Sequence, residues 1–394
     1  MQTKVFYTYK FRLYPNSEQI KFLNQEIGNA RFVYNYFLAR AINLYKNENV
    51  KFNYNKLSKE LTEIKKKFDF LNLSNSQTLQ QSLKNLQKAF KNFFEKRSGF
   101  PKFKKKKESN SIIIPITNKN VKILELNRKF SLIKIPKLKS LLKFRKHRDI
   151  LGRIISVRIT KTSSGKFYLN ILTERQISHL PKTGKKVGID LGLNHFCILS
   201  DGIKIINPRQ YRKKLKRLKR LQRSLSRKKK GSSNYKKAKA KLSKFHEKIV
   251  NLRNDFLHKL SKSIVKKYDF IAVEDLSIKN MIKNKYLSLS IADASWSKFL
   301  NFLEYKSNWY GKKFIKIHKF FPSSKTCSNC GSVKSELKLS ERIFRCPECK
   351  FEIDRDLNAA INILIEGLRQ VGAERAELTP METPLGVVEV GSLD

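Results

Sequence analysis

The chain has 394 residues, of which 40% are hydrophobic, enough to bury more than one core and to exclude wholesale disorder. It carries 85 Lys and Arg against 32 Asp and Glu, a formal net charge of +53. Residues 204–248 hold twenty basic residues and one acid, which favours a nucleic-acid partner over a membrane surface. No apolar run is long enough to span a bilayer, and the N-terminus lacks the apolar core of a signal peptide. We therefore expect a cytoplasmic, nucleoid-associated protein with reduced cysteines.

The first half of the chain predicts a small β-barrel with a helical insert. Residues 4–14 are aromatic and β-branched, as is typical of a strand. Asn16 and Gln19 have the spacing of a capping box, which predicts that a helix begins there. Further helices are predicted at 56–68 and 77–96, and further strands at 112–116, 130–135, 154–159 and 167–172. Pro115 places the first of those strands at a sheet edge.

The second half alternates strands and helices in another order. Strands are predicted at 187–190, 196–199, 204–206, 270–273 and 314–317, and helices at 209–230, 235–267, 294–311 and 356–368. Asp201 and Gly202 predict a hairpin turn. The first two helices are amphipathic and strongly basic. The order of elements is typical of an RNase H-like fold, so the fold class expected for the whole chain is a multidomain mixture of α/β and α+β. The tail, 370–394, is expected to be flexible.

Isolated carboxylates close two of these strands. Asp190 ends the first strand of the second half, and Glu274 ends the fourth. A third acid, Asp356 or Asp354, lies at the start of the last helix, and we favour Asp356 because the small residues after it allow close approach to the sheet. Carboxylates from separate elements can hold two Mg²⁺ ions for phosphodiester hydrolysis.

Four of the five cysteines have the spacing of a structural zinc site. Cys327 and Cys330 form one pair, and Cys346 and Cys349 form the other. The fifth cysteine, Cys197, lies in an apolar run and is expected to be a buried small hydrophobe. The six histidines include no pair two residues apart, which argues against the metal site of single-strand tyrosine transposases. No Walker-type phosphate loop is present.

Together these motifs resemble the TnpB family of insertion-sequence proteins. The motifs that carry the resemblance are Tyr9–Pro15, Gly99–Phe103, Gly188–Leu193, Val273–Leu276, Phe321–Gly331 and Asp354–Ala360. The family implies an RNA-guided DNA endonuclease with a RuvC-like nuclease domain, two Mg²⁺ ions at Asp190, Glu274 and Asp356, and one zinc at the four cysteines. It implies as partners a guide RNA from the element end and target DNA, both double-stranded and single-stranded. The acidic tail departs from the basic tails expected in the family.

The resemblance also divides the chain into functional segments. The barrel comprises its first strand, 1–15, and residues 101–184, and the insert, 16–100, reads a short motif beside the target. The nuclease occupies 185–320 and contains the basic helical pair 209–267, followed by the zinc ribbon, 321–352, the last nuclease motif, 353–369, and the tail, 370–394. Candidate nucleic-acid contacts are Tyr54, Gln80 and Lys84 in the insert, Lys102, Lys104 and Lys105 in a basic linker, and Lys228, Lys229 and Lys230 in the helical pair.

Two other functions are open to the same sequence. A transposase would join element DNA ends directly, because the RNase H-like fold also hosts that chemistry. A non-catalytic regulator would bind nucleic acid and use the acids only structurally. Metal-dependent cleavage separates the regulator from the two enzymes, and a joining assay separates the enzymes from each other.

Overall fold

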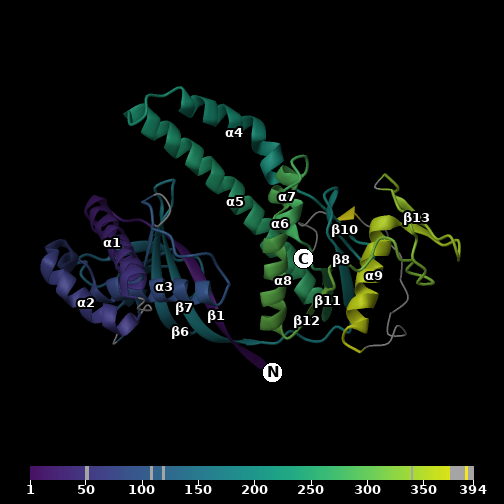
Figure 1. Cartoon of the computed structure of the whole chain (residues 1–394), viewed down its shortest axis with the longest axis horizontal. Coiled ribbons are helices and arrows are strands. Elements are labelled where there is room, and N and C mark those ends of the chain that lie inside the picture. Colours follow the sequence, from purple (N-terminus) through teal and green to yellow (C-terminus); the bar gives the residue numbers. More distant parts are fainter. Residues whose placement is uncertain (49–52, 107–109, 118–119, 339, 373–386, 389–394) are drawn as a thin grey trace. The chain divides into compact units, whose positions relative to one another are not determined.

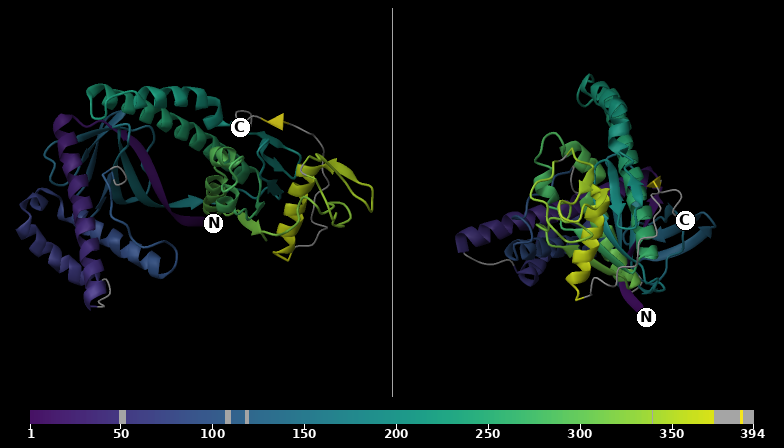
Figure 2. Two further views of the ribbon diagram at one scale, coloured as in Figure 1. Left: turned by 45° about the horizontal axis from the view of Figure 1, so that its top comes forward. Right: turned by 90° about the vertical axis from the view of Figure 1, so that its right-hand side faces the viewer.

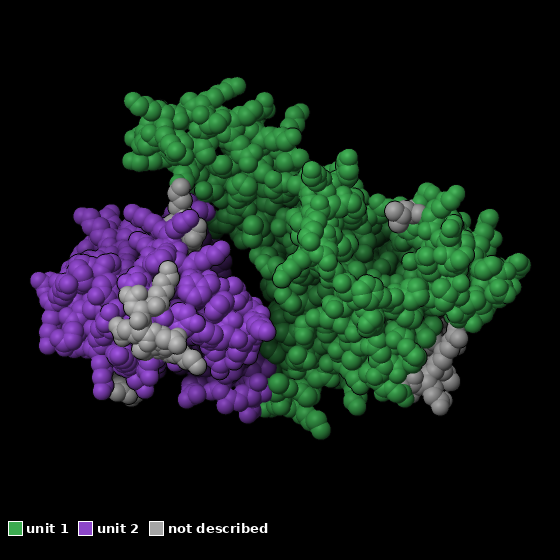
Figure 3. Space-filling model, viewed as in Figure 1, with its two compact units in different colours: residues 1–3, 177–394 green, residues 4–176 purple. Residues whose placement is uncertain are grey.

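The computed structural model describes residues 1–48, 53–106, 110–117, 120–338, 340–372 and 387–388. The chain forms two compact units (Figure 3). One comprises residues 4–176, and the other comprises residues 1–3 and 177–394.

A seven-stranded sheet organises the unit of residues 4–176. Its strands are β1 (Gln2–Leu13), β2 (Ser111–Pro115), β3 (Lys122–Asn127), β4 (Phe130–Lys134), β5 (Leu142–Arg145), β6 (Arg153–Lys161) and β7 (Phe167–Ser178), in the order β2-β6-β7-β1-β5-β4-β3. The first strand thus lies in the middle of the sheet. Pro115 lies on an edge strand, as predicted. The sequence did not predict β3, which is mostly exposed, or β5, which has only four residues.

The helices of this unit are α1 (Ser17–Glu48), α2 (Tyr54–Lys67), the 3-10 helix η1 (Asp69–Leu73) and α3 (Ser76–Phe94). The predicted capping box is present, because the Asn16 amide donates to the Gln19 side chain at 3.0 Å and the Gln19 amide donates back at 2.9 Å. Phe37, Leu71 and Leu83 are buried in a core shared by the helices. The predicted helices at 56–68 and 77–96 are confirmed to within two residues at each end.

A second sheet organises the other unit. Its strands are β8 (Lys186–Asp190), β9 (His195–Leu199), β10 (Lys204–Ile206), β11 (Phe270–Glu274), β12 (Lys313–Ile317) and β15 (Val387–Val388), in the order β12-β11-β8-β9-β10-β15. Strand β8 runs parallel to β11 and antiparallel to β9. The predicted turn at Asp201 and Gly202 joins β9 to β10. Most of the tail predicted to be flexible lies outside the described residues, and Val387 and Val388 pair with β10.

Helices cover both faces of this sheet. They are α4 (Gln210–Ser226), α5 (Ser233–Lys267), α6 (Ile278–Met281), α7 (Ser288–Ala294), α8 (Trp296–Tyr310) and α9 (Arg355–Arg369), and a small hairpin of β13 (Ile343–Arg345) and β14 (Glu352–Asp354) precedes α9. Val187 and Ile189 of β8 pack in one core with residues of α5 and α8. Ala272 of β11 packs in a second core with Ile363 and Leu364 of α9. The sheet therefore separates α5 and α8 from α9.

The basic helices α4 and α5 lie side by side and form an arm (Figures 1 and 2). Leu218 of α4 packs on Phe245 and Ile249 of α5 in a small core of their own. Only the second half of α5, including Leu257 and Leu260, packs on the sheet. The apolar stripes of α4 and of the first half of α5 therefore pack on each other and not on the sheet. Their basic residues are displayed on a two-helix projection.

Helix α9 approaches the sheet too closely for side chains at two points. A Cβ atom at Gly188 of β8 would overlap the carbonyl oxygen of Ala360 and lie 2.6 Å from the Leu364 nitrogen. A Cβ atom at Gly367 of α9 would lie 2.6 Å from the Cβ atom of Ala272. Both contacts require glycine, because backbone and Cβ atoms cannot move away as the end of a long side chain could. The small residues after Asp356 do allow the close approach that we expected.

Gly188→Ala should therefore destabilise the unit by about 3 kcal/mol, the upper end of the cost of overpacking a core. Urea unfolding followed by tryptophan fluorescence reports on this unit, because Trp296 is buried in its core. An unchanged midpoint for Gly188→Ala would contradict the contact between α9 and β8.

Candidate active site and metal centre

Asp190 and Glu274 end neighbouring strands on the same side of the sheet. Ile189 of β8 pairs in register with Val273 of β11, so the two acids follow at matching positions of parallel strands. Side chains alternate along a strand, so Asp190 projects to the same face as Gly188, and Glu274 to the same face as Ala272. Gly188 and Ala272 both face α9. Both carboxylates therefore project toward the helix that carries Asp356.

The structure gives Asp354 and Asp356 different surroundings. Asp354 is the N-cap of α9, and its carboxylate accepts the Asp356 amide at 3.0 Å and the Leu357 amide at 3.1 Å. Its other oxygen lies 2.7 Å from the Lys204 ammonium. Asp356 makes a looser contact, 3.3 Å from the guanidinium of the adjacent Arg355. Asp354 therefore has its oxygens engaged in capping and an ion pair, whereas Asp356 is more available to a cation.

The electrostatics of the three acids indicate mutual proximity. Burial, with the nearby carboxylates of Glu274 and Asp356, raises the pKa of Asp190 to about 8. Burial also raises the pKa of Glu274, although the Ser323 hydroxyl that donates to it acts in the opposite direction. Burial opposes ionisation of Asp354 too, but the Lys204 ammonium and the helix amides hold its pKa below the ordinary value. Crowded, buried carboxylates of this kind are characteristic of functional sites and of sites for cations.

Within the part of the chain that the structure describes, the residues gathered closely enough to hold a single metal ion are four cysteines, and the three acids are not among them. A site for two ions about 3.5–4 Å apart needs ligands spread over a wider span than a site for one ion.

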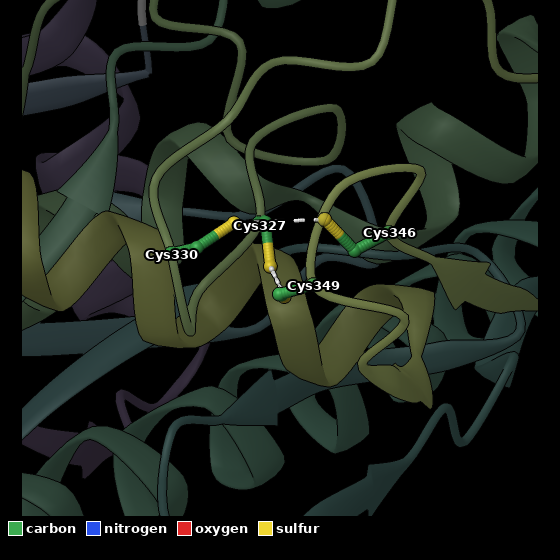
Figure 4. Close-up of side chains that lie close together, drawn as sticks. All are labelled: Cys327, Cys330, Cys346 and Cys349. Atoms are coloured by element: carbon green, nitrogen blue, oxygen red, sulfur yellow. Dashed lines mark hydrogen bonds between the residues drawn. The ribbon is translucent and has the colours of Figure 1, made fainter.

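Cys327, Cys330, Cys346 and Cys349 come together as predicted (Figure 4). The Sγ atoms of Cys327 and Cys349 are 3.7 Å apart, and those of Cys330 and Cys346 are 3.6 Å apart. Four sulfurs at about 2.3 Å from a tetrahedral zinc would lie about 3.8 Å apart. The Ser332 side chain beside Cys346 lowers the pKa of that thiol to about 6, which favours the thiolate that binds metal. The four cysteines could therefore hold a metal ion such as zinc. Cys197 is fully buried in the core, as predicted.

Five of the six candidate lysines in the arm and the linker are exposed, and Lys104 is the exception. Lys228, Lys229 and Lys230 are exposed in the turn between α4 and α5. Lys102 and Lys105 are also exposed. Lys104 is not equivalent to them, because its ammonium lies 3.6 Å from the centre of the Tyr34 ring and burial lowers its pKa to about 8. The Lys104 backbone also bonds to Asn35, so this residue anchors the linker to α1.

The three candidates of the helical insert lie close together. The Lys84 ammonium of α3 is 5.9 Å from the centre of the Tyr54 ring at the start of α2. Gln80 is exposed one helical turn before Lys84 on α3. The set therefore forms a polar and aromatic patch on one face of the insert.

Sequence reasoning missed four polar residues around the acids. They are Lys204, which pairs with Asp354; Ser323, which donates to Glu274; and Asn358 and Asn362, which bind the cysteine-bearing segment. Asn358 is one of the small residues that follow Asp356, and its side chain binds the cysteine-bearing segment. The sequence signal for the asparagines was their spacing of four, which places both on one face of α9. Among the described residues, no helix is both long and apolar enough to cross a membrane.

Family models match three parts of the chain. Residues 169–285 match a model described as a probable transposase, OrfB of the IS605 type. Residues 296–363 match a Cas12f1-like TNB domain, and residues 1–50 match a helix-turn-helix domain of the same OrfB group.

Relatives cover nearly the full chain. A putative RNA-guided DNA endonuclease of Streptomyces pristinaespiralis is 37% identical over 372 residues, which cover 93% of this chain and 91% of the relative. The putative RNA-guided DNA endonuclease InsQ of Escherichia coli K12 is 35% identical over 377 residues, covering 91% and 92%. The Cas12f1 chain in a cryo-EM structure of a Cas12f1-sgRNA-target DNA complex has a similar fold, with a TM-score of 0.64 at 15% identity, covering 91% of this chain and 98% of that one. As the motifs predicted, the chain belongs to the TnpB family.

Proposed function

We propose that the protein is an RNA-guided DNA endonuclease encoded by a transposable element. The observation that carries the proposal is the placement of Asp190, Glu274 and Asp356. Two of these acids end neighbouring parallel strands, and the third begins the helix packed on those strands. Relatives named putative RNA-guided DNA endonucleases, which cover 93% and 91% of the chain, support the same activity.

The strand order supports a RuvC-type, RNase H-like nuclease. In the order β10-β9-β8-β11-β12, only β9 runs opposite to the other four strands. Acids at the ends of the central strands β8 and β11 are then presented at one edge of the sheet, where a nucleic-acid strand can reach them. The seven-stranded sheet of the other unit would correspond to the N-terminal barrel, and α1, α2 and α3 to the insert that reads a motif beside the target.

Asp190, Glu274 and Asp356 would hold two Mg²⁺ ions. When bound, such ions stabilise charge on a phosphodiester and lower the pKa of a coordinated water. The chain's own side chains orient the ligands: Ser323 donates to Glu274, and Lys204 pairs with Asp354 and keeps it in its capping position. The Arg355 guanidinium at Asp356 offsets part of the negative charge of the cluster. The four cysteines would hold one structural zinc.

A guide RNA and target DNA are the proposed partners, because the relatives are named as RNA-guided DNA endonucleases and the similar Cas12f1 fold was solved with guide RNA and target DNA. The basic arm of α4 and α5 and the linker lysines would bind phosphates of the guide or of its duplex with the target. The description of the family model as a probable transposase favours, as a second candidate, direct joining of element ends.

The defining test is redirection of cleavage by a changed guide. RNA that copurifies with the protein should be sequenced, and its guide segment replaced by one that matches a new plasmid site beside the same flanking motif. We expect Mg²⁺-dependent cleavage to move to the new site and to disappear in Asp190→Asn. Cleavage of one fixed site whatever the guide, or joining of element ends without RNA, would favour the transposase instead.

The substitutions Asp354→Asn and Asp356→Asn should have different effects on cleavage. Asp356→Asn removes a metal ligand and should abolish cleavage. Asp354→Asn preserves a side chain that can cap α9, and loses chiefly the Lys204 ion pair, so cleavage should persist at a reduced rate. Single-turnover cleavage rates at saturating Mg²⁺ distinguish the two. The assignment fails if Asp354→Asn is inactive while Asp356→Asn still cuts.

Binding through the arm should depend on salt in a measurable way. Changing Lys228, Lys229 and Lys230 together to alanine removes up to three phosphate contacts, so the slope of log affinity for guide RNA against log salt should become shallower by about 2 to 3. The matched control changes the same lysines to arginine and should keep the slope. Filter binding at several salt concentrations measures it. An unchanged slope in the alanine variant would exclude this turn from the RNA interface.

A further inference from the structure

A continuous set of hydrogen bonds joins the cysteine-bearing segment to α9. Asn358 holds the peptide groups on both sides of Cys327. Its Nδ2 donates to the Thr326 carbonyl at 2.7 Å, and its Oδ1 accepts the Ser328 amide at 3.0 Å. One side chain of α9 therefore fixes the backbone that presents a metal-ligating thiol.

Asn362 extends this set by one helical turn. Its Nδ2 donates to the Thr326 carbonyl at 2.6 Å and to the Ser323 carbonyl at 2.9 Å. The Ser323 hydroxyl in turn donates to the carboxylate of Glu274. The five residues from Ser323 to Cys327 thus carry both a metal-ligating thiol and the hydroxyl that orients a proposed catalytic carboxylate.

The side chains of Asn358 and Asn362 are buried, so their polar atoms must find hydrogen-bond partners within the protein. Asn358 is 0% exposed and Asn362 is 2% exposed. The partners fix the orientation of each amide, since Asn362 faces two carbonyls and only its NH₂ group can satisfy them. A buried carbonyl left without a donor is costly, so displacement of the segment disturbs the partners on α9 as well.

Simple anchoring of the segment to α9 would explain the asparagines but not the serine. The asparagines connect the segment only to α9. The Ser323 hydroxyl adds a bond from the same segment to Glu274 at the end of β11. The neighbouring turn is also closed by its own backbone, because the Thr326 amide donates to the Pro322 carbonyl at 3.0 Å. A shift of the Cys327 backbone is therefore passed to the Ser323 hydroxyl within one short, hydrogen-bonded turn.

We propose that Asn358 and Asn362 are positioning residues that couple metal binding at the four cysteines to the geometry of Glu274, with Ser323 as the final contact. The inference rests on the proposed role of Glu274 as a ligand of the catalytic cation. It makes the cysteine-bound metal a determinant of cation affinity at the acids, in addition to its role in holding the ribbon together.

The test measures two kinds of metal binding on the full-length protein without any cleavage assay. Mn²⁺ binding is titrated by electron paramagnetic resonance, counting only the binding that Asp190→Asn abolishes. Zinc retention is followed by transfer to a chromogenic chelator. The variants are Ser323→Ala, Ser323→Thr and Asn362→Ala, with Asn301→Ala, an exposed asparagine on α8, as the matched control.

Ser323→Ala should weaken Mn²⁺ binding about tenfold, the lower end of what a lost contact to a metal ligand costs, and should retain zinc as the unchanged protein does. Ser323→Thr keeps the hydroxyl and should restore Mn²⁺ binding. Asn362→Ala should weaken Mn²⁺ binding and also release zinc faster. Asn301→Ala should change neither property.

Removing zinc from the unchanged protein provides a test that does not depend on an asparagine variant folding. Zinc-free protein should bind Mn²⁺ as weakly as Ser323→Ala, and removing zinc from Ser323→Ala should add little, because both changes act through one contact. Unaltered Mn²⁺ binding in zinc-free protein, or in Asn362→Ala that has lost zinc, would overturn the coupling and leave the asparagines as anchors. Failure of guided cleavage in the unchanged protein would instead contradict the proposed function and leave these binding measurements intact.

Discussion

The close packing of α9 on strands β8 and β11 is the constraint on which the candidate site depends. Gly188 and Gly367 leave no room for side chains at the two points of contact, so the helix backbone lies directly against the sheet. Asp190 projects two residues beyond Gly188, and Asp356 precedes the contacting Ala360 by about one turn. Because the acids have fixed offsets from the contacts, the packing that stabilises this face also brings the three carboxylates together. Burial at this packed face, together with the neighbouring carboxylates of Glu274 and Asp356, raises the pKa of Asp190.

The same helix organises the cysteine-bearing segment that precedes it in sequence. One face of α9 packs on the sheet, and Asn358 and Asn362 on another face hold the turn that contains Cys327. Asp354 caps the helix and is held by Lys204 of β10. A 15-residue helix thus connects the sheet, the acids and the cysteine cluster. The basic arm contributes less to the core of this unit. Only the second half of α5 packs on the sheet, and the rest of the arm exposes basic side chains to solvent.

Local rules predicted the parts of the structure that local interactions determine. The capping box at Asn16 and Gln19, the edge strand at Pro115 and the cysteine spacing each depend on a few neighbouring residues, and each was confirmed. The strands that end in Asp190 and Glu274 were evident because they are buried and apolar. Strands β3 and β5 were missed because neither has a clear strand pattern of its own: β3 is mostly exposed and pairs with β4 at the edge of the sheet, and β5 has only four residues, held between β4 and β1. The contacts of Ser323, Asn358 and Lys204 could not be predicted, because they depend on how separate elements pack.

The central claim is that α9 brings Asp356, and not Asp354, to a cation site shared with Asp190 and Glu274. Anomalous X-ray diffraction from crystals of the full chain soaked in Mn²⁺ tests it most directly. The account predicts manganese peaks bounded by the carboxylates of Asp190, Glu274 and Asp356, with Asp354 still capping α9 and paired with Lys204. Peaks coordinated by Asp354, or no peak between β8, β11 and α9 while manganese binds elsewhere, would contradict it.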